Sequence, residues 1–241
     1  MMKLYVYCVA DRNPGFVTPQ VGLGANEVEF LKFGDLVVGA SKFGGEVVEV
    51  NRENAMAHDA VVRRIFSEVT VLPFRFGTLI TNEKLDSYMR SKHISLAERL
   101  ASLQNCVEMS VKVIWRNDVD SKPQNTNFPS GLGEGTAFLL SKREQIRADD
   151  QLSREAGAIA GSLANELGSL IRSEKVTIEP RQKLVVSASY LIERGSETDF
   201  RELLKEVDSE RSDLHFLTSG PWPPYTFANI ELEFETHFGV S

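Results

Sequence analysis

The side chains that could carry out chemistry are few and widely spaced in this chain. The four histidines, His58, His93, His215 and His237, do not occur at spacings such as H-x-x-x-H that bind a metal ion. Asp59 follows the first of them, but adjacent residues of a helix do not face each other. The two cysteines lie in separate apolar stretches, so we expect buried thiols and neither a zinc site nor a disulfide. The sequence therefore predicts no metal and no cofactor.

Catalysis and nucleic-acid binding are both disfavoured. The chain contains no P-loop, no Gly-x-Gly-x-x-Gly and no Gly-x-Ser-x-Gly motif. A small-molecule enzyme remains an alternative only if a cleft brings His58, Asp59 and Arg75 together. The net charge is -7, and residues 131–241 hold 12 basic against 19 acidic side chains, so the surface repels phosphate. Binding to another protein is the other function class to be considered.

Two aromatic segments are the candidates for that binding. Phe74 and Phe76 flank Arg75, and Trp222 and Tyr225 lie among three prolines. Aromatic side chains and arginine are frequent binding hot spots. Rigid aromatic side chains also cost little conformational entropy to order. The alternative for the first segment is that both phenylalanines lie in the core with the arginine pointing outward. The alternative for the second is a loop folded over its own domain.

Local patterns predict the elements that position these segments, and they indicate an α+β fold. In the first part, apolar runs and helical stripes predict strands over 3–9, 28–31, 36–40, 69–72 and 108–115, an extended stretch over 74–80, and helices over 52–67 and 83–103. Asn51 is a suitable N-cap for the first of these helices. This order predicts an N-terminal ferredoxin-like α/β sandwich over residues 1–120.

The second part of the chain predicts another α+β domain. Residues 121–134 are rich in Asn, Ser, Pro and Gly and are expected to form a linker. Residues 135–241 are expected to form the C-terminal domain, with a long helix over 135–173 and then strands over 176–179, 184–192 and 214–218 around a helix over 197–211. No uncharged apolar run reaches about 18 residues, and the first residues predict a strand and not a signal peptide. We therefore expect an intracellular protein that does not enter a lipid membrane.

Two strings in the chain go beyond these general patterns. Val71-Leu72-Pro73-Phe74-Arg75-Phe76-Gly77-Thr78 and Thr218-Ser219-Gly220-Pro221-Trp222-Pro223-Pro224-Tyr225-Thr226-Phe227 resemble the two signature segments of the gas vesicle protein F/L family (GvpF/GvpL). Shorter stretches resemble the family in the same order, among them 5–7, 58–62, 111–113 and 135–143. The resemblance spans most of the chain and lies closer to GvpF. The family has an Asn where this chain has Asp59.

The resemblance implies a non-catalytic accessory or minor structural component of gas vesicles. These are hollow, gas-filled protein shells that give buoyancy to aquatic microbes, and their main shell protein, GvpA, is small and very apolar. The family is expected to bind GvpA, together with other gas vesicle accessory proteins, and to limit its aggregation during nucleation and assembly. The resemblance also implies an N-terminal ferredoxin-like domain and a C-terminal α+β domain. Phe74, Arg75, Phe76, Trp222 and Tyr225 are the expected partner-binding residues.

Overall fold

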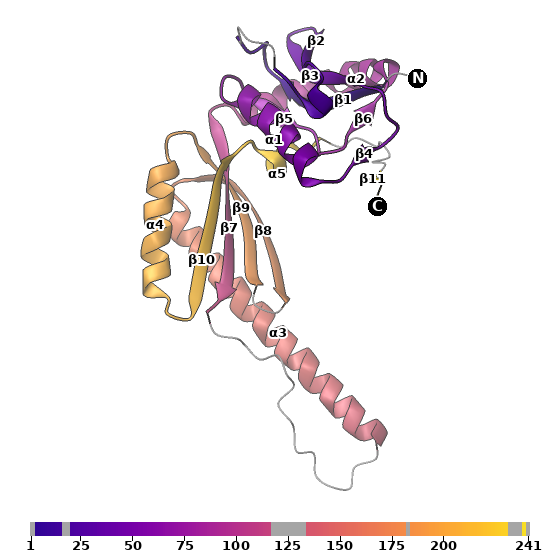
Figure 1. Ribbon diagram of the computed structural model, residues 1–241. Helices are drawn as coiled ribbons and strands as arrows, with labels where there is room; N and C mark the ends of the chain where they lie inside the picture. The colour runs from indigo at the N-terminus through magenta and orange to yellow at the C-terminus, as the bar shows by residue number, and fades with distance from the viewer. Residues whose placement is uncertain (1–2, 16–19, 117–133, 182–183, 231–237, 240–241) are drawn as a thin grey trace. The chain divides into compact units, whose positions relative to one another are not determined.

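A computed structural model of the chain describes residues 3–15, 20–116, 134–181, 184–230 and 238–239. These residues form two compact units (Figure 1). The first unit comprises residues 1–108 together with 221–241, and the second comprises 109–220. The α+β class expected from the sequence is confirmed. Among the described residues, no helix is both long enough and apolar enough to span a membrane.

The first unit is built on an antiparallel sheet in the order β2-β3-β1-β5, with β6 also paired to β1. Every residue of β1 from Leu4 to Ala10 is buried, so both faces of this central strand are covered. Helices α1 and α2 both pack against β1 and β5. The elements are β1 (Lys3–Ala10), the short 3-10 helix η1 (Leu23–Ala25), β2 (Glu29–Phe33), β3 (Leu36–Phe43), β4 (Val48–Glu49), α1 (Arg52–Phe66), β5 (Val71–Pro73), β6 (Leu79–Ile80) and α2 (Asn82–Ser102).

Local sequence explains the start of α1 and the first hairpin. The Asn51 side chain accepts a hydrogen bond from the backbone N–H of Asn54 at 2.8 Å, as expected for the N-cap. The turn between β2 and β3 contains Gly34 at a φ of +67°, a conformation that favours glycine. The hairpin and both helices are where the sequence predicted them.

The second unit has the strand and helix order of a ferredoxin-like sandwich. Its elements are β7 (Cys106–Trp115), α3 (Glu134–Leu167), β8 (Ile171–Arg181), β9 (Leu184–Glu193), α4 (Glu197–Glu210) and β10 (Leu214–Trp222). The sheet order is β10-β7-β9-β8, which is the fourth, first, third and second strand of a βαββαβ unit. Helix α3 packs on β8, β9 and α4.

The compact units differ from the expected boundaries at residues 120 and 134. The strand over 108–115 was expected to belong to the first domain, but β7 pairs with β9 and β10 of the second unit. The alternation of side chains in β7 predicts a half-buried strand and carries no information on which strands it joins. The C-terminal segment beyond residue 220 belongs to the first unit, where it forms α5 (Tyr225–Ala228) and β11 (Phe238–Gly239), and β11 pairs in parallel with β4. Most of the expected linker lies outside the described residues.

Two local expectations are wrong. The long helix ends at Leu167, not at 173, because the chain turns at Gly168 and continues as β8 from Ile171. The stretch 74–80 is not extended throughout, since a tight turn around Gly77 separates β5 from β6. In both places the pattern of apolar residues continues in the sequence past a glycine, whereas the backbone changes direction at that glycine.

Candidate functional site

The first signature segment ends in a turn that is held at several points. After β5, the backbone N–H of Phe74 donates to the carbonyl of Tyr7 at 2.9 Å. The carbonyl of Arg75 then accepts hydrogen bonds from the backbone N–H of Thr78 at 3.3 Å and from its Oγ1 at 2.6 Å. Gly77 occupies the third position of this turn with a φ of +84°, which a residue with a Cβ rarely adopts. Residues 75–78 therefore form a constrained turn, called here the Arg75 turn.

A cluster of buried polar side chains contacts this turn. The Tyr5 hydroxyl lies 2.8 Å from Nδ1 of His58 and accepts a hydrogen bond from the backbone N–H of Gly77 at 3.3 Å. The edge of the Phe76 ring meets the His58 ring, with their centroids 6.0 Å apart. The Tyr7 ring stacks on the imidazole, with their centroids 5.6 Å apart. The hydroxyl of Tyr5 thus ties the turn to helix α1.

The cluster is electrically neutral near pH 7. His58 is 3% exposed, and its burial lowers the imidazole pKa to about 4, against weaker opposing effects of the Phe74 backbone and the Asp59 charge. Burial also raises the pKa values of the Tyr5 and Tyr7 hydroxyls. A neutral imidazole bonded to a neutral phenol stabilises the fold and is not set up as a general base at neutral pH.

The three candidate residues of this segment have different surroundings. Phe74 is 1% exposed and lies in the core of the first unit, so it contributes to the fold and not to an accessible surface. Phe76 is half-buried. The Arg75 side chain is exposed, and it makes no hydrogen bond or ion pair with any residue that the structure describes. The turn therefore presents a guanidinium to solvent from a constrained backbone.

The second signature segment packs on helix α1. Trp222 is half-buried, and the guanidinium of Arg63 lies 4.0 Å from the centroid of its ring. The same guanidinium pairs with Asp59 one helical turn earlier, at 2.6 Å from Nε to Oδ2. The chain continues through two buried prolines into α5, which begins at the half-buried Tyr225.

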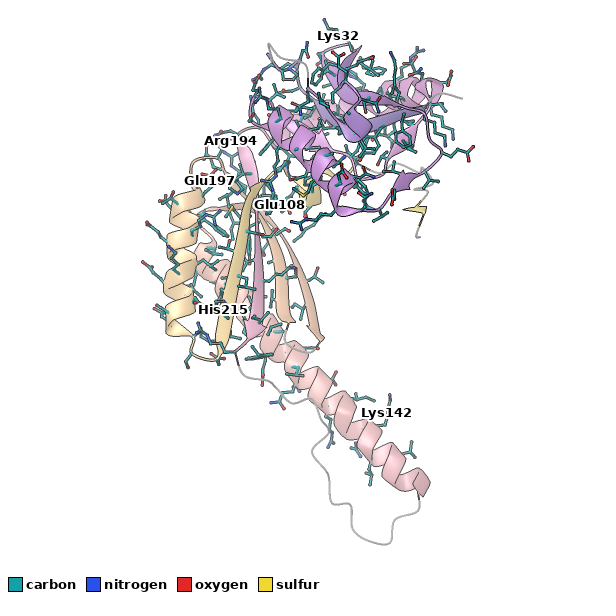
Figure 2. The ribbon with its side chains drawn as sticks, viewed as in Figure 1. Lys32, Glu108, Lys142, Arg194, Glu197 and His215 are labelled. Atoms are coloured by element: carbon teal, nitrogen blue, oxygen red, sulfur yellow. The ribbon has the colours of Figure 1, made fainter. Side chains whose placement is uncertain are left out.

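Glu108 anchors this segment, and sequence reasoning missed it. The carboxylate is 4% exposed and accepts hydrogen bonds from the backbone N–H of Thr226 at 2.8 Å and from its Oγ1 at 2.5 Å. Figure 2 labels this side chain on β7. An acidic residue between Val107 and Met109, in an otherwise apolar stretch, was the available signal. A buried carboxylate needs such partners, because an unpaired charge is costly to bury.

The two signature segments, about 140 residues apart in the chain, meet in the first unit. Helix α5 packs directly against β5. Burial raises the pKa of the Tyr225 hydroxyl, and the charged or titratable groups close enough to contribute include Asp59, Arg63 and Tyr5. We call the exposed or half-buried candidates at this junction, Arg75, Phe76, Trp222 and Tyr225, the signature junction.

The three residues of the enzyme alternative do not converge. His58 is buried and bonded to Tyr5, Asp59 is paired with Arg63, and the Arg75 side chain is exposed. The described residues also contain no group of three or more His, Cys, Asp or Glu side chains arranged to hold a metal ion. Both cysteines are buried free thiols.

Comparison with known proteins decides the family. The sequence model of the family described as "Gas vesicle synthesis protein GvpL/GvpF" matches residues 3–229. The chain belongs to this family. Gas vesicle protein L of a Streptomyces strain is 25% identical over 95% of the chain and 94% of its own length. Gas vesicle protein F of Haloferax mediterranei is 24% identical over 95% of both chains. Relatives named F and L thus match this GvpL/GvpF protein about equally well.

Two solved GvpF structures have the same fold. The crystal structure of GvpF from a species of Anabaena superposes with a TM-score of 0.79 over 98% of this chain and all of that one, at 21% identity. GvpF from Microcystis aeruginosa gives a TM-score of 0.74 over 95% of this chain and 99% of that one, at 19% identity. The fold of this chain is therefore that of GvpF.

Proposed function

We propose that this GvpL/GvpF protein is a non-catalytic accessory or minor structural component of gas vesicles inside the cell. It binds the shell protein GvpA, and other gas vesicle accessory proteins, and limits the aggregation of GvpA during nucleation and assembly. The signature junction is the contact surface. Family membership supports the association with gas vesicle proteins, and the choice of GvpA rests on the resemblance in the two signature segments.

The choice of this surface rests on the exposure of the Arg75 side chain. Its side chain is exposed without a partner among the described residues, while the turn below it is held by Thr78 and Tyr5. Because the backbone of the turn is already constrained, Arg75 gives up little backbone conformational freedom when it binds, so more of the interaction energy is retained. The half-buried ring of Trp222 adds the other residue type that is enriched in hot spots.

The charge of the chain suits such a role. A small apolar shell subunit would aggregate through exposed apolar faces and strand edges before assembly. The net charge of -7, contributed entirely by residues 131–241, helps keep a complex with that subunit in solution.

Co-purification with GvpA tests this proposal. The chain should retain GvpA in the supernatant, and Arg75→Ala and Trp222→Ala should each weaken binding by about 30-fold, which corresponds to a hot-spot loss of about 2 kcal/mol. Arg52→Ala is the matched control, because this arginine is also exposed but lies at the start of α1. Circular dichroism verifies that each variant is folded. Equal binding by all variants would overturn the signature junction, and failure of the wild-type chain to bind GvpA would overturn the function.

A further inference from the structure

Arg75 carries a charge that has no counterpart in the described part of the chain. Other exposed arginines of the first unit do have one. Arg12 pairs with Asp11 at 3.6 Å. Arg90 pairs with Asp86, one helical turn earlier in α2, at 3.3 Å. The guanidinium of Arg75 instead keeps N–H donors that no described residue accepts.

The titratable groups around the signature junction do not add a compensating negative charge near pH 7. Arg63 and Asp59 form an ion pair at 2.6 Å, so their charges cancel. The Tyr225 hydroxyl stays protonated, because burial raises its pKa, and the imidazole of His58 stays neutral, because burial lowers its pKa to about 4. These four groups sum to zero, and the charge of the junction is therefore that of Arg75.

The turn itself leaves binding to the side chain of Arg75. Its carbonyl already accepts hydrogen bonds from the N–H and the Oγ1 of Thr78. The N–H of Gly77 already donates to the Tyr5 hydroxyl. A contact at this turn therefore draws its directional hydrogen bonds mainly from the guanidinium.

A partner that covers the junction has to provide an acceptor for this charge. Removing a guanidinium from water without a counter-charge is costly, because nothing replaces its lost hydration. A purely apolar surface suits the half-buried rings of Phe76 and Trp222 but is disfavoured at Arg75. A carboxylate suits it well, because its two oxygens match the planar fork of the guanidinium and accept two parallel hydrogen bonds.

We infer that Arg75 recognises a carboxylate of the shell protein, on an Asp or Glu side chain that lies beside apolar residues. This inference rests on the proposed function and adds to it the chemistry of the segment that docks on the signature junction. The aromatic members of the junction supply the apolar contact. The ion pair selects which segment of the shell protein docks there and in which orientation.

Charge reversal on both sides of the contact tests the inference. Each Asp and Glu of GvpA is replaced by Lys in turn, and the Kd for the full chain is measured by pull-down titration. Arg75→Glu should weaken the binding of native GvpA by about 100-fold, because attraction becomes repulsion. One of the GvpA reversals should weaken binding to the wild-type chain and restore binding to Arg75→Glu by about tenfold or more.

Two further variants separate a carboxylate contact from a general effect of charge. Arg75→Lys should lose about tenfold, since an ammonium group cannot form the two parallel hydrogen bonds. Arg52→Glu is the matched control, because it makes the same change in net charge at another exposed arginine of the first unit. It should bind native GvpA as the wild type does, and no GvpA reversal should bind it better than native GvpA. Circular dichroism verifies that the variants are folded.

The failure of this inference can be told from the failure of the proposed function. If the wild-type chain does not bind GvpA, the function is overturned and the inference with it. If the wild type binds, the inference alone is overturned when Arg75→Glu binds as well as Arg52→Glu, or when no GvpA reversal restores Arg75→Glu. Between about 50 and about 300 mM NaCl, binding by the wild type should also weaken more than binding by Arg75→Gln, and equal salt dependence would overturn the inference as well.

Discussion

Removal of the Tyr5 hydroxyl tests the link between the Arg75 turn and the core. In Tyr5→Phe, Nδ1 of His58 loses its 2.8 Å contact, and the buried N–H of Gly77 loses its acceptor. A buried polar group left without a partner costs about 1–3 kcal/mol, so the two together predict a loss of about 3 kcal/mol in the free energy of unfolding. With a typical urea dependence, the unfolding midpoint should fall by about 1 M or more.

The chain offers a matched control for this substitution. The Tyr190 hydroxyl is also buried, but it has no hydrogen-bond partner among the described residues. Tyr190→Phe removes the same atom from a site where it makes no bond, so stability should be unchanged or slightly higher. Urea unfolding followed by circular dichroism measures both variants, and amide exchange of Gly77 should accelerate only in Tyr5→Phe. If the two variants lose the same stability, or Tyr5→Phe loses none, the supporting role of the cluster is refuted.

The remaining predictions concern the buried His58 and the anchor of the second signature segment. Between pH 6.5 and about 4 the unfolded chain protonates His58 and the folded chain does not, so stability should fall by about 3 kcal/mol as the pH drops through this window. His58→Gln should remove that part of the pH dependence, and an unchanged slope in urea unfolding would contradict the burial effect. Glu108→Gln and Thr226→Val should each cost about 1–3 kcal/mol, and the double variant should cost clearly less than their sum. If the losses in stability of the two single variants add up in the double variant, the two hydrogen bonds do not couple Glu108 and Thr226. The fluorescence of Trp222 would reveal whether the second signature segment has moved.

The sequence predicted the elements and the family well, but it predicted the pairing of strands poorly. Periodicity placed the helices α1, α2 and α4 and the strands β1 to β3 within a few residues. It could not assign β7 to a sheet, because alternation specifies which face of a strand is buried and not which strand lies beside it. The complete ferredoxin-like order of the second unit follows from that assignment and was therefore not predicted for residues 109–220.

For the candidate site, the residue types were predicted and their surroundings were not. The string around Arg75 was recognised from the sequence, but the burial of Phe74 and the exposure of Arg75 depend on what packs against β5. Glu108 lies in no motif, and the short stretch 5–7 that resembles the family does not reveal the role of Tyr5. Each acts through a partner that is distant in the chain: Thr226 for the carboxylate, and His58 and Gly77 for the hydroxyl.

The sequence by itself determined the α+β class, the N-cap of α1, the excess of acidic charge in the second half and membership of the GvpL/GvpF family, since all four depend on residue types or on contacts within a few residues. Only the tertiary structure decided that residues 221–228 complete the first unit, that the two signature segments meet, and that Leu139 and Ile146 of α3 are exposed. The physical reason is that these features arise from contacts between segments far apart in the chain, and the residues on either side carry no local mark of their partner.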